Sequence, residues 1–286
     1  MIARPTFRFA PSPNGELHLG HAYSALLNFD AARRHDGRFL LRIEDIDAGR
    51  SKPEHVAGIF DILSWLGIDW EEPVRWQSEH FVDYRASADR LLTDDLLYPC
   101  FASRMEIELA VGENRRDPDG ARRYPGIWRH ADRATVSRRT ASGEPFALRL
   151  NMGRALDTLT HDLMFGAFDP TDLVIGAARV ARPDRWGDCV VVRKEMPTSY
   201  HLSVVVDDAL QGVTHVIRGK DLEAATDVHV LLQALLGLPA PAYHHHQLLM
   251  GPDGEKLSKR LASASLRQMR AEGATPADIR RLAGLP

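Results

Sequence analysis

The sequence has few of the features expected of a protein outside the cytoplasm. It has only two cysteines, Cys100 and Cys189, which form no CxxC pair and cannot make a disulfide framework. No uninterrupted apolar run approaches the roughly 20 residues that a membrane-spanning helix needs, and the residues before Thr6 lack the apolar segment of a signal peptide. We therefore expect a cytoplasmic protein with no membrane contact.

Strong net charge is also absent. The formal charge is -3, with 26% charged and 44% hydrophobic residues, which is the composition of a globular protein and excludes disorder of the whole chain. Lysine is scarce, with five lysines among 36 basic residues. Between Glu113 and Arg139, eight arginines accompany four acids. This stretch is either a solvated face or a basic surface for nucleic acid.

The chain opens with the pattern of a strand, a turn, a helix and a second strand. Thr6–Ala10 alternates like a half-buried strand, Leu17–Arg34 has helical spacing, and Arg38–Ile43 is a second apolar strand. This order within about 40 residues is a βαβ unit, which implies a parallel sheet with a right-handed crossover. The predicted fold class is α/β with a parallel sheet.

The rest of the chain divides by composition and hydrophobic pattern. Amphipathic or apolar runs predict helices at 55–66, 84–97 and 226–236 and strands at 146–150, 189–193 and 202–206. The arginine-rich stretch and several Pro/Gly turns predict a small α+β unit inserted into the sheet. We expect four parts: 1–97, the first half of a larger domain; 98–192, the inserted unit; 193–262, the second half of the larger domain; and 263–286, a tail with mostly one short helix.

The first candidate site follows the opening strand. After a Pro/Gly loop that includes Pro11, two histidines, His18 and His21, stand three residues apart around Gly20. Residues at this spacing share one helix face, and a helix N-terminus attracts anions through its N–H groups and dipole. The pattern indicates a phosphate site, although two helical histidines alone are more often surface residues.

The second candidate site lies near the end of the chain. Two lysines three residues apart, Lys256 and Lys259, flank Ser258 in a glycine-containing loop. A lysine ammonium can follow negative charge onto leaving phosphates. Alone this segment resembles any basic surface loop, but two such motifs at the two ends of an α/β chain predict a nucleotide site.

Together, His18–His21 and Lys256–Arg260 resemble the HIGH and KMSKS signatures of class I aminoacyl-tRNA synthetases. The segments that resemble the glutamyl-tRNA synthetase catalytic domain, over about residues 6–262, are Arg8–Pro13, Leu41–Asp47, Tyr200–Leu202, Val205–Asp208 and Gly212–Asp221. A helical anticodon-binding domain would follow in such a synthetase, and the chain stops before one. With Val204 and Gln211–His215, it is similar to the glutamyl-Q tRNA(Asp) synthetase family, which attaches glutamate to queuosine in the anticodon loop of tRNA(Asp).

The resemblance implies a Rossmann-like parallel sheet, with residues 1–97 and 193–262 as the two halves of the catalytic domain. It also implies a ligase-type glutamyl transferase. Glutamate and ATP, with Mg²⁺, would give glutamyl-adenylate, and the glutamate would then pass to a hydroxyl of the modified base. The residues that the resemblance places around ATP are Pro11, His18, Gly20, His21, Lys256, Ser258 and Lys259. His18 and His21 would contact ATP, while Lys256 and Lys259 would stabilise charge on the phosphates.

The resemblance also implies a glutamate pocket. Arg8 and Arg218 would bind the carboxylates, because guanidinium pairs with carboxylate through two hydrogen bonds. Glu44 would bind the α-ammonium and Tyr200 would add a hydroxyl, and Ala10 and Ser12 would line the same pocket. Taken singly, Arg8 could be a strand-surface arginine and Glu44 the ion-pair partner of Arg42.

One family feature is broken. Relatives hold zinc in the inserted unit, and the matching positions here are Cys100, Ala102, Tyr124 and Trp128. One cysteine and one tyrosine are too few for structural Zn²⁺, which takes about four ligands. We therefore expect no zinc, with Trp128 filling the space. The consecutive histidines 244–246 would alternate in direction in a strand and would not converge on one ion.

Three functions remain open from the sequence. The first is the modification enzyme, with L-glutamate, ATP and queuosine-bearing tRNA(Asp) as substrates and no protein partner required. The second is a truncated glutamyl-tRNA synthetase that charges tRNA(Glu). The third is a catalytically silent RNA-binding paralogue, against which the complete pair of signatures argues.

Overall fold

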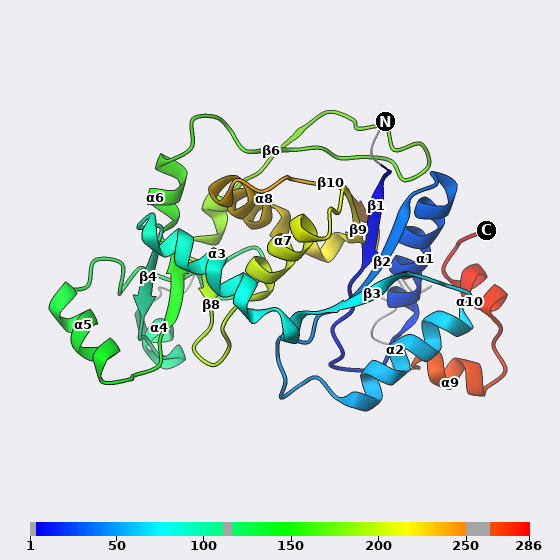
Figure 1. Ribbon diagram of the computed structural model, residues 1–286, viewed down its shortest axis with the longest axis horizontal. Helices are drawn as coiled ribbons and strands as arrows, with labels where there is room; N and C mark the ends of the chain where they lie inside the picture. Colours follow the sequence, from blue (N-terminus) through cyan, green and yellow to red (C-terminus); the bar gives the residue numbers. More distant parts are fainter. Residues whose placement is uncertain (1–3, 111–115, 250–263) are drawn as a thin grey trace.

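The computed structural model describes residues 4–110, 116–249 and 264–286 (Figure 1). The strands are β1 (Thr6–Phe9), β2 (Arg38–Ile43), β3 (Glu71–Trp76), β4 (Leu97–Cys100), β5 (Ala147–Leu150), β6 (Met164–Phe165), β7 (Arg179–Val180), β8 (Val190–Val192), β9 (His215–Gly219) and β10 (Ala242–His246). The α-helices are α1 (Leu19–Arg34), α2 (Pro53–Trp65), α3 (Phe81–Thr93), α4 (Arg104–Ala110), α5 (Arg133–Ala141), α6 (Met152–Asp157), α7 (Tyr200–Leu210), α8 (Ala225–Leu236), α9 (Leu266–Ala271) and α10 (Pro276–Leu282). Short 3₁₀ turns are η1 (Gln77–Glu79), η2 (Pro183–Trp186) and η3 (Lys220–Leu222).

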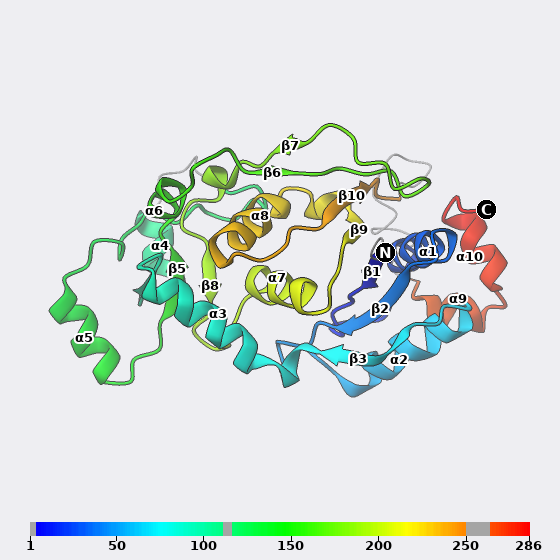
Figure 2. The same cartoon turned by 45° about the horizontal axis from the view of Figure 1, so that its top comes forward.

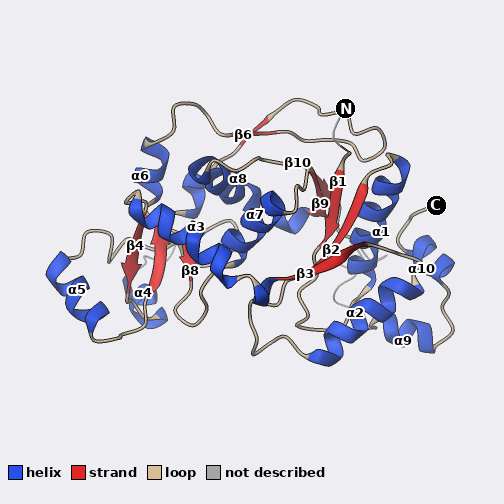
Figure 3. Ribbon diagram, in the orientation of Figure 1, coloured by secondary structure: helices blue, strands red, loops and turns tan. Residues whose placement is uncertain are grey.

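A parallel sheet forms the centre of the molecule (Figure 3). Strands β1, β2 and β3 pair in parallel in that order, and β9 pairs in parallel with β10. The two groups join at their amino ends, where the backbone N–H of Thr6 donates to Oγ1 of Thr214 (2.8 Å) and the N–H of Thr214 donates to the carbonyl of Thr6 (3.0 Å). The resulting order is β10-β9-β1-β2-β3, and the predicted Rossmann-like α/β fold is confirmed.

This order makes the boundary between β1 and β9 a topological switch point, because the chain runs outward from it in both directions. Ligands of open α/β sheets bind in the crevice outside the carboxyl ends of the strands at such a point. The carboxyl ends here are Phe9 and Gly219. The fold therefore predicts the position of the functional cleft before any side chain is considered.

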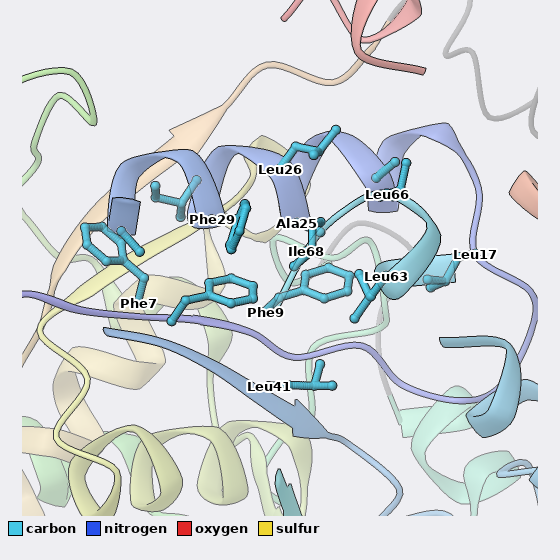
Figure 4. Packing of buried hydrophobic residues seen from close by; sticks show 14 of the residues in the cluster. Phe7, Phe9, Leu17, Ala25, Leu26, Phe29, Leu41, Leu63, Leu66 and Ile68 are labelled. Carbon is cyan, nitrogen blue, oxygen red and sulfur yellow. The ribbon is translucent and has the colours of Figure 1, made fainter. Parts of the chain in front are cut away.

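A hydrophobic core fixes β1 and β2 under α1 (Figure 4). Phe7, Leu26, Leu41 and Leu63 are fully buried in it, and each side chain of this size contributes roughly 1.5–3 kcal/mol on burial. A second core joins α3, α7 and α8. Within the described part of the chain, no helix has both the length and the apolar character needed to cross a membrane.

An antiparallel unit lies at the other end of the molecule. Strands β4, β5 and β8 pair antiparallel in that order, with α4 and α5 beside them (Figure 1). A long ribbon containing β6 and β7 returns along one side of the molecule toward the parallel sheet (Figure 2). The division of the chain at residues 97/98, 192/193 and 262/263 stays a prediction.

Two helical elements differ from the sequence prediction. Residues 202–206 lie in the middle of α7 and not in a strand. All residues from Leu202 to Asp208 are buried, so the run shows no helical alternation and its valines imitate a strand. The helix predicted to reach Leu97 ends at Thr93, because Asp95 takes a left-handed conformation (φ 58°) and Leu97 begins β4.

The C-terminal segment contains two short helices where mostly one was expected. Gly273 (φ 96°) interrupts the helical path, and Thr275 starts α10 with a reciprocal capping box to Asp278. Both helices are anchored, since Leu266 and Ile279 are fully buried. This tail packs against α1 and α2 (Figure 1).

Candidate active site

A cleft of about 480 Å³ opens at the carboxyl ends of β1 and β9. Its lining includes every predicted site residue that the structure describes: Arg8, Ala10, Pro11, Ser12, His18, Gly20, His21, Glu44, Tyr200 and Arg218. The predicted residues Lys256, Ser258 and Lys259 lie outside the described residues. Segments distant in sequence therefore meet at the switch point of the sheet.

Two histidines cap the first helix. His18 is the N-cap of α1, where its Nδ1 accepts from the N–H of Gly20 (3.1 Å), and Nδ1 of His21 accepts from the N–H of His18 (3.2 Å). The two rings stack with their centroids 3.7 Å apart. A Cβ added to Gly20 would lie 3.1 Å from the His18 ring, so glycine gives that ring its room.

These bonds fix the protonation of both rings. Burial lowers the pKa of His18, and burial together with His18 lowers the pKa of His21 to about 4, so both are neutral near pH 7. Because each Nδ1 accepts a backbone N–H, each proton must be on Nε2. The helix N-terminus thus presents two Nε2–H donors beside the cleft, which suits an anion.

A charge-matched cluster supports one wall of the cleft. Asp208, on α7, accepts from Nε of Arg8 (3.1 Å) and pairs with Nη2 of Arg42 (2.8 Å). Burial would raise the pKa of Asp208, but the two arginines lower it. These three residues are 5% exposed or less, so the pairs are shielded from solvent and hold Arg8 in place.

The neighbouring Asp207 is fully buried and anchors the same cluster. Its carboxylate accepts from Nε of Arg75 (2.7 Å), Nε2 of Gln77 (2.8 Å) and Oη of Tyr84 (3.0 and 2.9 Å). These partners come from β3, η1 and α3. The network therefore ties the central sheet to the helices of the second core.

Glu44 follows β2 and lines the cleft. Its carboxylate lies 3.4 Å from Nη2 of Arg42. Burial raises the pKa of Glu44, and Arg42 and Arg8 oppose that rise. Glu44 thus lines the cleft with a carboxylate that can receive an ammonium group, and Arg42 contacts the same carboxylate.

Arg218 has quite different surroundings. It is 4% exposed, and its bonds go to neutral groups: Oγ1 of Thr226 (2.7 Å), Nδ1 of His229 (3.1 Å), Oη of Tyr200 (3.4 Å) and Nε2 of His245 (3.4 Å). In the described ranges no carboxylate pairs with it. A buried cation without a counter-ion costs several kcal/mol, so this guanidinium is suited to receive an anionic ligand.

The histidines around Arg218 are uncharged near pH 7. Burial and then Arg218 lower the pKa of His201 to about 4 and that of His245 to about 3, and they hold the pKa of His229 well below its usual value. Tyr200, the first residue of α7 after the capping Ser199, accepts from Arg218. Among the described residues its hydroxyl hydrogen has no acceptor, so it can donate to a ligand.

The sequence prediction missed the residues that support this pocket, although the sequence contains a signal for some of these residues. Arg42 and Asp208 are charged residues inside apolar runs, and a buried charge needs a partner of opposite sign. No comparable signal singled out Thr226, His229 or His245, because a threonine or histidine in an apolar helix or strand is ordinary.

The four positions that correspond to the relatives' zinc ligands pack against one another, mainly through apolar contacts. The thiol of Cys100 donates to Oη of Tyr124 (3.3 Å), both pack with Ala102, and Trp128 covers them. No group of three metal-ligating side chains occurs in the part of the chain that the structure describes. Residues 244–246 form the end of β10, where consecutive side chains alternate in direction.

The arginine-rich stretch divides into paired and exposed residues. Arg129 pairs with Asp188 (2.7 Å), and Arg139 lies 4.7 Å over the ring of Trp128. Arg133 and Arg138 are exposed on α5, a helix without buried residues at one end of the molecule (Figure 1). Part of this charge therefore supports the inserted unit, and part is open to solvent.

The family follows from a sequence comparison. A family model described as "tRNA synthetases class I (E and Q), catalytic domain" matches residues 6–285, so the match also covers the two C-terminal helices. The chain belongs to this family. It is an enzyme of the ligase type that acts in glutamate–tRNA chemistry, a class that uses an amino acid, ATP and a tRNA.

Particular relatives narrow the resemblance. The chain is 48% identical to "Glutamyl-Q tRNA(Asp) synthetase" of Rhodobacter capsulatus over 97% of this chain and 99% of that protein. It is 40% identical to "Glutamate--tRNA ligase" of Aquifex aeolicus over 94% of this chain, but it spans only 54% of that relative. The crystal structure of a glutamate tRNA ligase from Elizabethkingia meningosepticum in complex with its amino acid superposes with a TM-score of 0.80 at 27% identity, over 98% of this chain and 60% of that one. The predicted resemblance to glutamyl-Q tRNA(Asp) synthetases and the predicted ligase activity are confirmed.

Proposed function

We propose that this enzyme activates L-glutamate with ATP and transfers it to the queuosine base of tRNA(Asp). The observation that carries the glutamate part is the buried Arg218, which faces the cleft with neutral partners only among the described residues. Glutamate brings two carboxylates and one ammonium. Arg8 and Arg218 supply cations for the former and Glu44 an anion for the latter, all within one cleft.

The first chemical step needs no covalent catalysis by the protein. The glutamate α-carboxylate attacks the α-phosphorus of ATP in line, a P–O bond forms, and the bond to the pyrophosphate leaving group breaks. Arg8, held by Asp208, and Arg218, held by Thr226, keep the nucleophile in one orientation. Orientation of reactants at attack distance can remove roughly 7–11 kcal/mol of a barrier.

The phosphates lie beside the first helix in this proposal. The Nε2–H groups of His18 and His21 donate to phosphate oxygens, and Pro11 and Gly20 let the nucleotide approach the backbone. Lys256, Ser258 and Lys259, outside the described residues, would complete the site by stabilising charge on the leaving pyrophosphate. Mg²⁺ would enter with ATP and offset phosphate charge.

The most specific part of the proposal is the acceptor of the glutamate, the queuosine base of tRNA(Asp). Its support is the similarity to the Rhodobacter capsulatus protein, which spans nearly the whole length of both chains. In the second step a hydroxyl oxygen of the modified base attacks the activated carbonyl, AMP leaves, and an ester forms. Exposed arginines such as Arg133 and Arg138 offer phosphate contacts for the RNA.

A single assay separates the candidate acceptors. Labelled glutamate and ATP are incubated with the enzyme and, in parallel, with tRNA(Asp) carrying queuosine, tRNA(Asp) without it, and tRNA(Glu). We expect label on the queuosine-bearing tRNA(Asp) and none on the other two. Label on both forms of tRNA(Asp), or on neither, contradicts the proposed acceptor.

The second candidate is a glutamate–tRNA ligase that charges tRNA(Glu). The 40% identity to the Aquifex aeolicus ligase favours it, although the match spans about half of that protein. Label on tRNA(Glu) in the same assay would establish it. A silent RNA-binding paralogue would give no ATP–pyrophosphate exchange with glutamate, with or without tRNA.

For the inserted unit, residues 98–192, we propose an acceptor-type subdomain that folds without zinc. Its support is the contact of Cys100 with Tyr124 under Trp128 in place of a ligand set. Metal analysis of the purified enzyme should find well under one zinc per chain. A chelator that unfolds this unit would contradict the proposal.

A further inference from the structure

The hydrogen bonds around Arg218 have a defined direction. A guanidinium only donates, so Nδ1 of His229, 3.1 Å from Nη1, accepts. A neutral imidazole with an accepting Nδ1 carries its proton on Nε2, and Nε2 of His229 lies 3.2 Å from Nδ1 of His201. The chain of bonds therefore runs from the guanidinium through His229 to His201.

The other side of the guanidinium follows the same rule. Nη2 donates to Oγ1 of Thr226 at 2.7 Å, which leaves the hydroxyl hydrogen of Thr226 free to donate to Nε2 of His245 at 3.0 Å. Thr226 and His229 lie three residues apart on α8 and hold the two terminal nitrogens of Arg218. One helix face thus fixes the guanidinium plane without cancelling its charge.

We propose that His229 is a positioning residue that keeps Arg218 selective for glutamate over glutamine. This inference deepens the proposed function and rests on it. His229 is 2% exposed and is not among the residues that line the cleft, so it acts through Arg218. A neutral acceptor here orients the guanidinium and leaves its positive charge for the substrate carboxylate.

The alternatives at this position have distinct consequences. An apolar side chain would leave Nη1 with only its longer bond to Oη of Tyr200 (3.4 Å) and would free the guanidinium to turn. A carboxylate would accept equally well but would neutralise the charge, so the preference for an anionic substrate would fall. The neutral imidazole meets both needs, and an asparagine, whose Oδ1 can take the place of Nδ1, should meet them too.

The test compares three variants of the full-length enzyme, His229→Asn, His229→Asp and His229→Leu, with His161→Asn at an exposed histidine as control. ATP–pyrophosphate exchange is measured with glutamate and with glutamine, in the presence of tRNA(Asp). We expect His229→Leu to raise KM for glutamate at least 10-fold, in line with the loss of a charge-assisted hydrogen bond, with KM for ATP and kcat within about threefold. His229→Asn should stay near the wild type.

His229→Asp gives the sharper readout, because it keeps the acceptor and the approximate volume of His229→Asn. Its preference for glutamate over glutamine in kcat/KM should fall at least 10-fold. Equal behaviour of the Asn and Asp variants would overturn the inference, even if the Leu variant does not fold. Wild-type enzyme that exchanges with neither amino acid would instead overturn the proposed function, so the two failures are distinguishable.

Discussion

Two buried arginines near the cleft have opposite surroundings: Arg218 lines the cleft, and Arg42 contacts Glu44, which lines it. Arg42, on β2, is fully buried and lies among three carboxylates, those of Asp208 (2.8 Å), Glu44 (3.4 Å) and Asp207 (3.8 Å). Burial opposes its charge, but these carboxylates raise the pKa of Arg42. Arg218, on β9, is almost as buried and bonds to hydroxyl and imidazole groups. The paired charges around Arg42 hold the fold together, whereas Arg218, whose partners among the described residues are neutral, is suited to an anionic ligand.

The largest expected effect is on activity at Arg218. Arg218→Met should lower kcat/KM for glutamate in ATP–pyrophosphate exchange about 10³-fold, or roughly 4 kcal/mol, because it removes the cation that receives a carboxylate. The free energy of unfolding should stay the same or rise, since an uncompensated buried charge disappears. A large loss of stability together with normal activity would reverse the assignment of the two arginines.

Arg42 should show the opposite pattern. Arg42→Met leaves Asp207 and Asp208 with fewer cations in a buried site, so the free energy of unfolding should fall by about 3–5 kcal/mol. Urea denaturation measures this loss. The double variant Arg42→Met/Asp208→Asn should recover part of it, whereas strictly additive losses would argue against a shared charge network.

The neutral histidines make the Arg218 side sensitive to acid. The pKa of His201 is about 4 and that of His245 about 3 in the folded chain, against about 6.5 when unfolded. The unfolded chain therefore binds more protons below pH 6.5, so stability is complete above that pH and falls as the pH drops. At pH 5 each histidine should cost at most about 2 kcal/mol.

Urea denaturation at pH 7.5 and pH 5 measures that loss. The variant His245→Asn, which lacks one of the titrating rings, should show a smaller difference between the two pH values. An unchanged difference would mean that the acid sensitivity originates elsewhere in the molecule.

A third arginine gives the smallest effect. Arg38 pairs with Glu71 at 2.6 Å, but the two side chains are 37% and 46% exposed. Arg38→Gln should cost 0–1 kcal/mol in urea denaturation, and added salt should remove most of that difference because solvent-exposed pairs are screened. A loss as large as that at Arg42 would show that burial is not what separates these arginines.

Local chemistry made the opening βαβ unit predictable from the sequence, whereas strand β3 (Glu71–Trp76) was not predicted. The boundaries of β2 match the predicted strand Arg38–Ile43, and α1 begins at the predicted histidine motif. A Pro/Gly loop, an apolar period and a positive φ at Asp36 all act within a few residues. Such signals do not depend on tertiary contacts, so a single sequence carries them.

The less successful predictions were those that depend on distant contacts. Residues 202–206 lack the apolar alternation of a surface helix because α7 is buried in contact with both α3 and α8. The sequence could group the cleft residues only through the family resemblance, because no sequence spacing relates Arg8 to Arg218. The neutral groups around Arg218 come from α7, α8 and β10 and become neighbours only after folding.

The histidine cap of α1 has a consequence for redesign. The same two rings start the helix through Nδ1 and face the cleft through Nε2. A serine or asparagine in place of His18 could still begin the helix, yet it would offer the nucleotide no imidazole N–H. One edge of the His18 ring therefore caps the helix, and the other edge would serve the proposed nucleotide contact. A substitution can remove the second role and keep the first.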